Sequence, residues 1–445
     1  MFYINKDQEL TIELLNKMIS KFNTDIKPTM ERYKKYYDGK HKILDKSYSD
    51  PTKPCSKVIT NYCKNIADSY CGYLASPGFI SYSSNEDITE VMNILRYNDY
   101  QAEDADLLLS ALVHGSAAEL MYTDELGKVR FKLINSLSCF GIYDNSLTND
   151  LLYFVRMYEA DDWDNTDLYN VDVYGDWTVK HYTMSGNNGY LTYVSEEYHY
   201  FSQCPANIIS LPDNKSIYDC VMSLQDASNE LLSSEIDDYS AFCDAYLSLT
   251  GLDAEEDDIV KMKENRVLLL PEGAAASWLT KNASDAQVEN MLKRIHDSIY
   301  RIAACPDFSS ESFVGGVSSG IAIRYRLTGM ETRAAKICAE FKKALQRRIE
   351  IISGIATLKL GEEVFRDIKI EFKRNIPEDV TSIINMINTL KGTVSDATLL
   401  GQLDFIQDVN AELEAVEAQK KANMEAFGFP LTNTSGSEEE ETEEE

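Results

Sequence analysis

The segment from Ile217 to Ser248 restricts the fold more than any other part of the sequence. Its apolar residues recur at helical spacing, which predicts one helix about 48 Å long. The segment carries no lysine or arginine, and seven acids: Asp219, Asp226, Glu230, Glu235, Asp237, Asp238 and Asp244. Because unpaired charges are costly to bury, we expect these carboxylates to lie in water or to meet another chain.

A small insert and a returning helix follow this long helix. Leu249–Ser284 contains two short apolar runs, Val267–Leu270 and one that ends at Trp278 and Leu279, with a Pro-Glu-Gly turn between them. Asp285–Ala304 then regains helical spacing and ends before Pro306. The order of long helix, small α/β insert and helix in return predicts a stalk that carries a knob.

The rest of the chain predicts an α+β fold that is predominantly helical. Short runs rich in Tyr, Val, Phe and Thr between Glu119 and Pro212 predict antiparallel strands. These runs are Leu151–Tyr158, Thr178–Thr183 and Tyr190–Val194. Helices are expected at Leu10–Tyr37, Lys57–Leu74, Asp87–Tyr97, Tyr100–Leu120, Gly320–Ile352, Glu378–Leu390 and Gln402–Ala426, with a further strand at Ile368–Phe372.

The net charge of −30 argues against a protein that grips nucleic acid tightly, because such proteins neutralise phosphates with clustered Lys and Arg. The terminal run Ser437–Glu445 supplies seven glutamates, and the remainder is still acidic. The nine cysteines include no C-x-x-C pair, which favours reduced thiols in the core. The N-terminus lacks a signal pattern, and no apolar run approaches about 18 residues, so we expect synthesis in the cytosol and no membrane span.

One short motif raises the possibility of an enzyme. Gly316–Gly320 reads G-x-S-x-G, which could place Ser318 on the nucleophile elbow of a hydrolase. An elbow needs an apolar strand directly before the serine, and the preceding residues PDFSSESFVGG are loop-like instead. No phosphate-binding glycine motif occurs, and the five histidines are scattered. The aspartates of 161–167 lack the order of a calcium loop and predict a solvated turn. We therefore expect no cofactor, no metal site and no catalytic residues.

Two further groups of residues stand out around the start of the helix predicted at 320–352. The loop 306–319 is rich in Ser, Gly and Phe, and it offers flexible backbone with apolar points of contact. Its candidate residues are Phe308, Ser309, Ser310, Phe313, Gly315, Gly316, Ser318 and Ser319. A basic stripe on one arc of the helix comprises Arg333, Lys336, Lys343 and Arg347.

Four separated blocks resemble the portal proteins of tailed bacteriophages, of the type found in siphophages of Gram-positive hosts. They are YYDGKHKI at 36–43, NYCKNIADSYCGYLASP at 61–77, PDFSSESFVGGVSSGIAIRYRLTGME at 306–331 and FKRNIPEDVTSIINMINTLKGTVSDATLL at 372–400. The blocks occur in the expected order and cover much of the chain. This resemblance is more specific than any single motif above.

The resemblance implies a portal-like ring subunit, usually in a dodecamer, with wing, stem, clip and crown. The wing would comprise 1–216, completed by the long helix and strand of 320–377. The stem would comprise the helix 217–248 and the returning helix 285–305. The clip would be the insert 249–284, and the tunnel loop would be 306–319. The helical crown would comprise 378–426, and a disordered acidic tail would follow at 427–445.

In such a ring, a wall of carboxylates would deny DNA phosphates a place to bind. The candidate channel-lining acids are Asp226, Glu230, Asp237, Asp238 and Asp244. The basic stripe could contact phosphates, although pairing with acids of an adjacent subunit is the favoured interpretation. The clip candidates are Val267, Leu268, Leu269, Leu270 and Trp278.

The implied function is that of a non-enzymatic conduit at one capsid vertex of the virion, assembled in the cytoplasm of the host bacterium. Double-stranded DNA would be packaged and ejected through the ring without sequence preference. The implied partners are a homo-oligomeric ring, a terminase large subunit that supplies ATP hydrolysis, a head-completion adaptor protein of the head-tail connector, and capsid and scaffolding proteins. Two alternatives remain: a serine hydrolase that uses Ser318, and a helical scaffold or adaptor protein without a pore.

Overall fold

The structure is a computed structural model of the chain. It describes residues 2–51, 53–76, 78, 80–160, 168–186, 189–242, 247–250, 275–278, 285–310, 320–355, 367–374, 380–400, 403 and 409–426. The chain divides into two compact units. The first contains residues 1–316 and 324–375, and the second contains residues 317–323 and 376–445.

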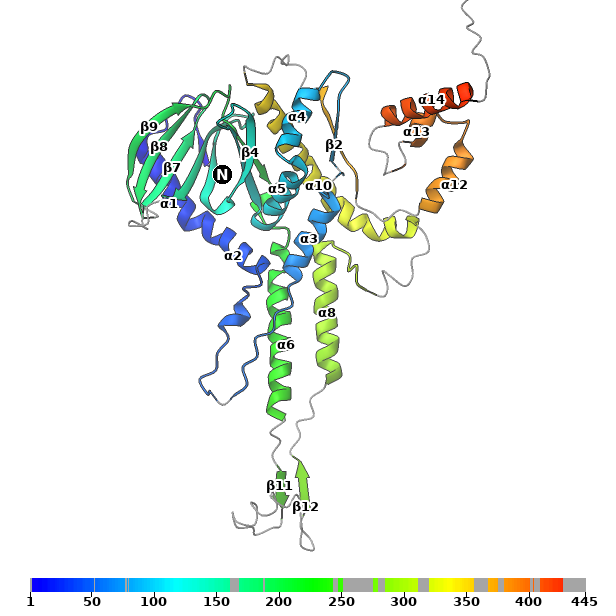
Figure 1. Cartoon of the computed structure of the whole chain (residues 1–445). Coiled ribbons are helices and arrows are strands. Elements are labelled where there is room, and N and C mark those ends of the chain that lie inside the picture. The colour runs from blue at the N-terminus through cyan, green and yellow to red at the C-terminus, as the bar shows by residue number, and fades with distance from the viewer. Residues whose placement is uncertain are drawn as a thin grey trace, which may run out of the picture. The chain divides into compact units, whose positions relative to one another are not determined.

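A six-stranded sheet is the largest layer of the first unit (Figure 1). Its order is β1-β5-β6-β7-β8-β9, in which β1 and β5 are parallel and every other pair is antiparallel. The strands are β1 (Phe2–Ile4), β5 (Cys139–Asp144), β6 (Leu151–Glu159), β7 (Leu168–Tyr174), β8 (Thr178–Ser185) and β9 (Leu191–Tyr198). The antiparallel strands predicted between Glu119 and Pro212 are therefore confirmed.

One face of this sheet packs against the N-terminal helices. α1 (Ile12–Lys21) continues through a π-helical turn, η1 (Phe22–Ile26), into α2 (Lys27–Tyr37). The apolar side of α1, with Leu15, Met18 and Ile19, shares one buried core with inward residues of the sheet such as Phe140 and Val155. The predicted helix Leu10–Tyr37 is thus present in outline, but the π turn in its middle was not predicted.

A three-stranded sheet, β10-β3-β4, forms a second core with the six-stranded sheet, in which Ala118, Leu120 and Ala206 share a buried cluster with Cys139 and Phe154. Its strands are β3 (Ser116–Thr123), β4 (Val129–Ile134) and β10 (Ala206–Ser210), and the helices beside it are α4 (Thr89–Tyr97) and α5 (Tyr100–His114). The prediction that α5 continues to Leu120 is wrong. Gly115 ends the helix with a φ of 86°, and a Cβ there would lie 2.3 Å from the carbonyl oxygen of Asn214. Only glycine fits this approach, and the chain turns directly into β3.

The long helix predicted at 320–352 is confirmed as α10 (Gly320–Ser353). Near its C-terminal end, Arg348 is fully buried and forms ion pairs with Asp104 of α5 and Glu119 of β3. Its guanidinium also lies 4.4 Å from the centre of the Phe131 ring. Asn207 of β10 completes the network by donating to Glu119 (2.7 Å) and to the Ala344 carbonyl (2.8 Å). Burial raises the pKa of Asp104 to about 6, although Arg348 opposes this shift.

Two antiparallel helices form a hairpin in the first unit (Figure 1). They are α6 (Met222–Phe242), preceded by the 3-10 turn η5 (Asp219–Val221), and α8 (Asp285–Ala303). The returning helix is confirmed, whereas the helix predicted at 217–248 is too long at both ends. The strand β11 (Leu247–Thr250) begins inside that range and pairs with β12 (Ala275–Trp278), with Leu247 opposite Trp278.

The strand predicted at Ile368–Phe372 is confirmed as β13 (Lys369–Phe372). Its partner is β2 (Ile80–Ser83), which was not predicted. α3 (Tyr62–Leu74) begins five residues later than expected, because the residues before it are extended. The described helices of the second unit that follow β13 are α12 (Val380–Leu390), α13 (Asp396–Leu400) and α14 (Val409–Ala426). Both helices expected in this region are present, and the residues 378–379, 402 and 404–408 of their predicted ranges lie outside the described residues.

Replacement of Arg348 tests the buried network. Arg348→Met leaves Asp104 and Glu119 without their cation in the core, so we expect the free energy of unfolding to fall by about 3–5 kcal/mol. Lys343→Met on the same helix is the control, because that lysine is exposed and pairs only with Glu340; its effect should stay within about 0.5 kcal/mol. Equilibrium denaturation measures both. Equal, small effects would contradict the proposed importance of the network.

Candidate functional site: the α6 and α8 hairpin

The face of α6 that turns toward the N-terminal region is buried yet polar. Gln225, Asn229, Ser233 and Asp237 follow one another at intervals of four residues, so they form one line along the helix. Buried polar side chains are found where hydrogen-bond partners meet them. The partner of this line is an extended segment, Ser56–Tyr62, that lies antiparallel along α6.

Every second backbone amide of the extended segment donates a hydrogen bond to α6, and each of these amides has a different side chain as its acceptor. The donors and acceptors are Ser56 to Asp237 Oδ1 (2.5 Å), Val58 to Ser233 Oγ (3.0 Å), Thr60 to Asn229 Oδ1 (3.1 Å) and Tyr62 to Gln225 Oε1 (2.9 Å). The spacing explains the match, because two extended residues rise about 6.6 Å and four helical residues rise about 6.0 Å. We call these four bonds the polar ladder.

His41 fixes the orientation of the polar ladder at Asn229. The His41 ring stacks on Tyr36 at 4.8 Å, and its Nε2 lies 2.9 Å from the Tyr36 carbonyl oxygen, so Nε2 carries the proton. Nδ1 must then accept a hydrogen bond, and it receives one from Asn229 Nδ2 at 2.8 Å. This leaves Asn229 Oδ1 for the Thr60 amide. Burial lowers the pKa of His41, although the Tyr36 carbonyl and the charge of Asp226 oppose the shift.

Several acids of the hairpin find partners in the same N-terminal region. Asp226 accepts from the Tyr36 hydroxyl at 2.7 Å and lies 3.3 Å from Lys42 Nζ. Lys46 lies 3.2 Å from Asp237 and 3.4 Å from Glu230. The expectation that these carboxylates meet only water or another chain is therefore wrong, because lysines from a distant part of the same chain pair with them.

The five candidate channel-lining acids consequently lie in different environments. Asp237 is buried, Asp226 is half-buried, and Glu230 and Asp238 are exposed. Asp244 lies outside the described residues. Glu230 and Asp238 are thus the more exposed of the described members in the single chain, and Glu230 also lies 3.4 Å from Lys46.

Arg333 joins α10 to both helices of the hairpin. Its Nη1 donates to the Ala303 carbonyl at the end of α8 (2.9 Å), and its Nη2 donates to the Ile217 carbonyl before α6 (2.6 Å). The Tyr70 hydroxyl of α3 donates to the Ala303 and Ala304 carbonyls, each at 3.0 Å. The last carbonyls of a helix lack intrahelical partners, and a guanidinium satisfies the Ala303 carbonyl at the end of α8 well. We call Arg333 with the Ala303 and Ile217 carbonyls the arginine clamp.

The predicted basic stripe therefore does not act as one surface. Arg333 is used by the arginine clamp. Arg347 donates to Gln203 Oε1 at 3.1 Å and lies 3.6 Å from Glu350. Lys343 pairs with Glu340 at 2.8 Å, and Lys336 is exposed. Sequence periodicity placed these four residues on one arc but could not show that two of them contact distant segments.

The remaining predicted site residues are only partly described. Phe308, Ser309 and Ser310 follow α8, and Asp307 accepts from the Ser309 amide (3.0 Å) and hydroxyl (2.6 Å). Phe313, Gly315, Gly316, Ser318 and Ser319 lie outside the described residues, as do Val267, Leu268, Leu269 and Leu270 and the aspartates of 161–167. Trp278 ends β12. Within the described parts of the chain, His, Cys, Asp and Glu form no group that could hold a metal ion, and no helix is long and apolar enough to cross a membrane.

The pH dependence of stability tests the hydrogen bond between His41 and Asn229, which we call the His41 lock. Because burial lowers the pKa of His41 below its ordinary 6.5, the unfolded chain takes up the proton first. The free energy of unfolding should therefore fall as the pH drops below about 6.5, since a protonated Nδ1 faces the Asn229 amide as a second donor. His41→Gln cannot titrate, so it should lose less stability between pH 7.5 and 5 in denaturation curves. Identical pH profiles for both proteins would contradict the lock.

Replacement of Arg333 tests the arginine clamp. Arg333→Gln removes two charge-assisted hydrogen bonds, and we expect a loss of about 2–3 kcal/mol in the free energy of unfolding. Hydrogen exchange should accelerate at the amides of Asp219 and Val221, which lie two and four residues after the clamped Ile217 carbonyl. Lys336→Gln, one turn along α10 and exposed, is the matched control and should leave exchange at these amides unchanged. Equal acceleration in both variants would contradict the clamp.

Comparison with known proteins identifies the family. A family model described as phage portal protein, SPP1 Gp6-like, matches residues 15–426. The portal protein of Bacillus phage SPP1 is similar at 20% identity over 426 residues, which cover 90% of this chain and 82% of that protein. The matched range includes α6, α8, α10 and all four sequence blocks that carried the resemblance. The chain therefore belongs to the family of SPP1 Gp6-like phage portal proteins.

Proposed function

We propose that this portal subunit forms a closed ring in which the α6 and α8 hairpin is the stem of the DNA conduit. Family membership supplies the coarse function: portal proteins are structural subunits of an oligomeric ring at the capsid vertex, and they have capsid and DNA-packaging partners. The finer assignment follows the order of elements. β11 and β12 then belong to the clip, α12 to α14 to the crown, and the two sheets with α10 to the wing.

The observation that carries this assignment is the reinforced hairpin. The polar ladder fixes α6 along its length, and the arginine clamp holds the ends of α6 and α8 to α10. A conduit wall must keep its shape while a stiff polyanion moves past it. A hairpin whose first helix is bound along its side and whose base is held to α10 meets that requirement better than a hairpin held by its own contacts alone.

The charges of the hairpin support a wall that does not retain DNA. α6 has no basic residue, and its exposed Asp238 remains a candidate for the channel surface, as does Glu230, although Glu230 also pairs with Lys46. Repulsion between fixed carboxylates and phosphates keeps the polyanion away from the wall. Asp226 and Asp237 support the wall from behind, because they pair with Lys42 and Lys46.

The proposal includes the partners that the sequence resemblance implies. A terminase large subunit would dock at the clip during packaging and would hydrolyse ATP, and a head-completion adaptor would take its place afterwards. Twelve subunits is the proposed number. The family match covers Ser318, so the G-x-S-x-G sequence lies inside a portal chain and gives no support to the hydrolase alternative.

Electron microscopy of the purified full chain tests the proposed function. We expect closed rings with a central bore wide enough for double-stranded DNA and a projecting stem in side views. Images should be taken at low and high salt, because subunit contacts between charged surfaces depend on ionic strength. Monomers or open filaments at every salt concentration would contradict the ring, and rings with a sealed centre would contradict the conduit.

A further inference from the structure

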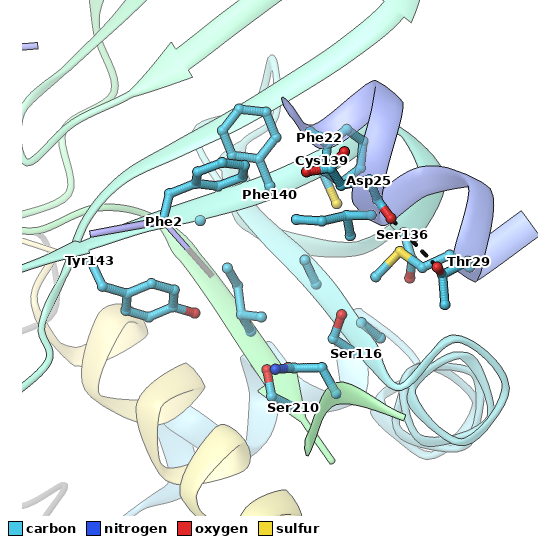
Figure 2. A pocket seen from close by; sticks show the side chains of 17 residues that line it. Phe2, Phe22, Asp25, Thr29, Ser116, Ser136, Cys139, Phe140, Tyr143 and Ser210 are labelled. Carbon is cyan, nitrogen blue, oxygen red and sulfur yellow. Dashed lines mark hydrogen bonds between the residues drawn. The ribbon is translucent and has the colours of Figure 1, made fainter. Parts of the chain in front are cut away.

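A half-open cavity of about 320 Å³ lies between the two sheets and the π-helical turn (Figure 2). Its walls are mostly apolar, with Phe2, Phe22 and Phe140 gathered along one side. Ser116 and Ser210 add hydroxyl groups from the neighbouring strands β3 and β10. Asp25 and Thr29 are exposed, which places the mouth at the junction of η1 and α2. The cavity could hold an aromatic side chain that carries a polar group.

Three large aromatic side chains project from the opposite edge of the six-stranded sheet. Trp177, Tyr198 and Tyr200 are 58%, 71% and 73% exposed. They lie close together, because Tyr198 is opposite Thr178 in the sheet and the His199 amide donates to the Trp177 carbonyl at 3.2 Å. β9 is an edge strand, and its outer side has no partner strand in the described sheet. We call these three residues the aromatic edge.

Tyr200 is held outward by its backbone. Its φ of 63° lies in the left-handed region, which a bulky side chain rarely adopts. The residues on either side are anchored, since His199 Nε2 bonds the Gly175 carbonyl at 3.0 Å and Phe201 is fully buried. Strain that the surroundings maintain at an exposed aromatic residue is typical of a functional constraint.

The aromatic edge lies beside the end of a transverse row of the same sheet that leads to the cavity wall. Neighbouring pairs run from Glu197, the residue before Tyr198, through Val179 and Tyr174 to Phe154, which lies opposite Gly141 in the cavity wall. Four strand spacings of about 4.8 Å separate β9 from β5. A copy of the chain displaced along this row would bring its aromatic edge toward the cavity. Complementary features at opposite edges give head-to-tail contacts, and such contacts form a ring when the rotation from one copy to the next closes.

We propose that the cavity of one subunit receives the aromatic edge of the neighbouring subunit. This inference rests on the proposed ring, and it assigns the side chains that join the wings of adjacent copies. The three aromatics supply roughly 300–500 Å² at their present exposure, which is a large part of the roughly 800 Å² that one partner buries in a standard interface. The tyrosine hydroxyl or the indole N–H would meet Ser116, Ser210 or Asp25.

A double-mutant cycle on the full chain tests the contact. Tyr198→Ser with Tyr200→Ser removes the edge, and Ser210→Phe fills the cavity from within. Each change should raise the protein concentration needed for half-maximal ring formation roughly 10- to 100-fold, as measured by mass photometry and electron microscopy. All changes together should raise it no further, because both sets remove the same contact.

Matched controls separate this contact from general effects. Leu126→Ser removes an exposed apolar residue on the β3–β4 turn, and Ser210→Thr keeps a small hydroxyl side chain; neither should shift assembly. If Ser210→Phe does not fold, Ser116→Leu fills the cavity instead. The inference would be overturned if the edge and cavity changes had additive effects on ring formation, or if the edge variant had no effect. Rings formed by the wild type would still uphold the proposed function in that case. Absence of rings in the wild type would instead overturn the proposed function.

Discussion

The polar ladder is the constraint on which the hairpin depends. An isolated helix with α6's run of carboxylates and short polar side chains has little apolar surface with which to hold its place. The four amides of Ser56–Tyr62 give its polar face a partner with matching spacing. Because each acceptor is buried, loss of the extended segment would leave unsatisfied oxygen atoms as well as missing bonds.

Arginines of α10 connect the hairpin to the rest of the first unit. Arg333 holds the hairpin ends, and Arg348 binds acids of α5 and β3 in the core. Two residues before Arg333, Glu331 accepts hydrogen bonds from Arg374 and from the Tyr73 hydroxyl, which ties α3 and the segment after β13 to the same helix. α10 thus acts as a common axis to which separate segments are fixed by charge-assisted bonds.

Sequence periodicity predicted that the long helices exist, but it predicted few of the segments that they contact. α8 and α10 were predictable because their apolar residues recur at helical spacing over many turns. The end of α5 was missed because it depends on the approach of Asn214, a residue far away in sequence, to Gly115. β2 was missed because its partner β13 lies almost 300 residues later. Such pairings leave no local pattern.

The candidate site shows the same limit. The acids of α6 were recognised, but their partners were not, since Lys42 and Lys46 lie in a segment that composition marks only as a turn and loop. A usable signal did exist: Gln225, Asn229, Ser233 and Asp237 share four-residue spacing and short polar side chains, which favours a polar partner over plain solvent. The cavity could not be predicted, because it depends on how two sheets and a π turn fill space.

The sequence separation of the polar ladder has a consequence for synthesis on the ribosome. Ser56 precedes its acceptor Asp237 by 181 residues. At about 5–20 residues per second, the extended segment emerges roughly 10–35 s before α6 exists to receive its amides. During that interval its donors are satisfied by water, and the nascent chain must complete both sheets first. The hairpin is therefore a late event in the biogenesis of each subunit, because it forms only after the strands of both sheets have been synthesised.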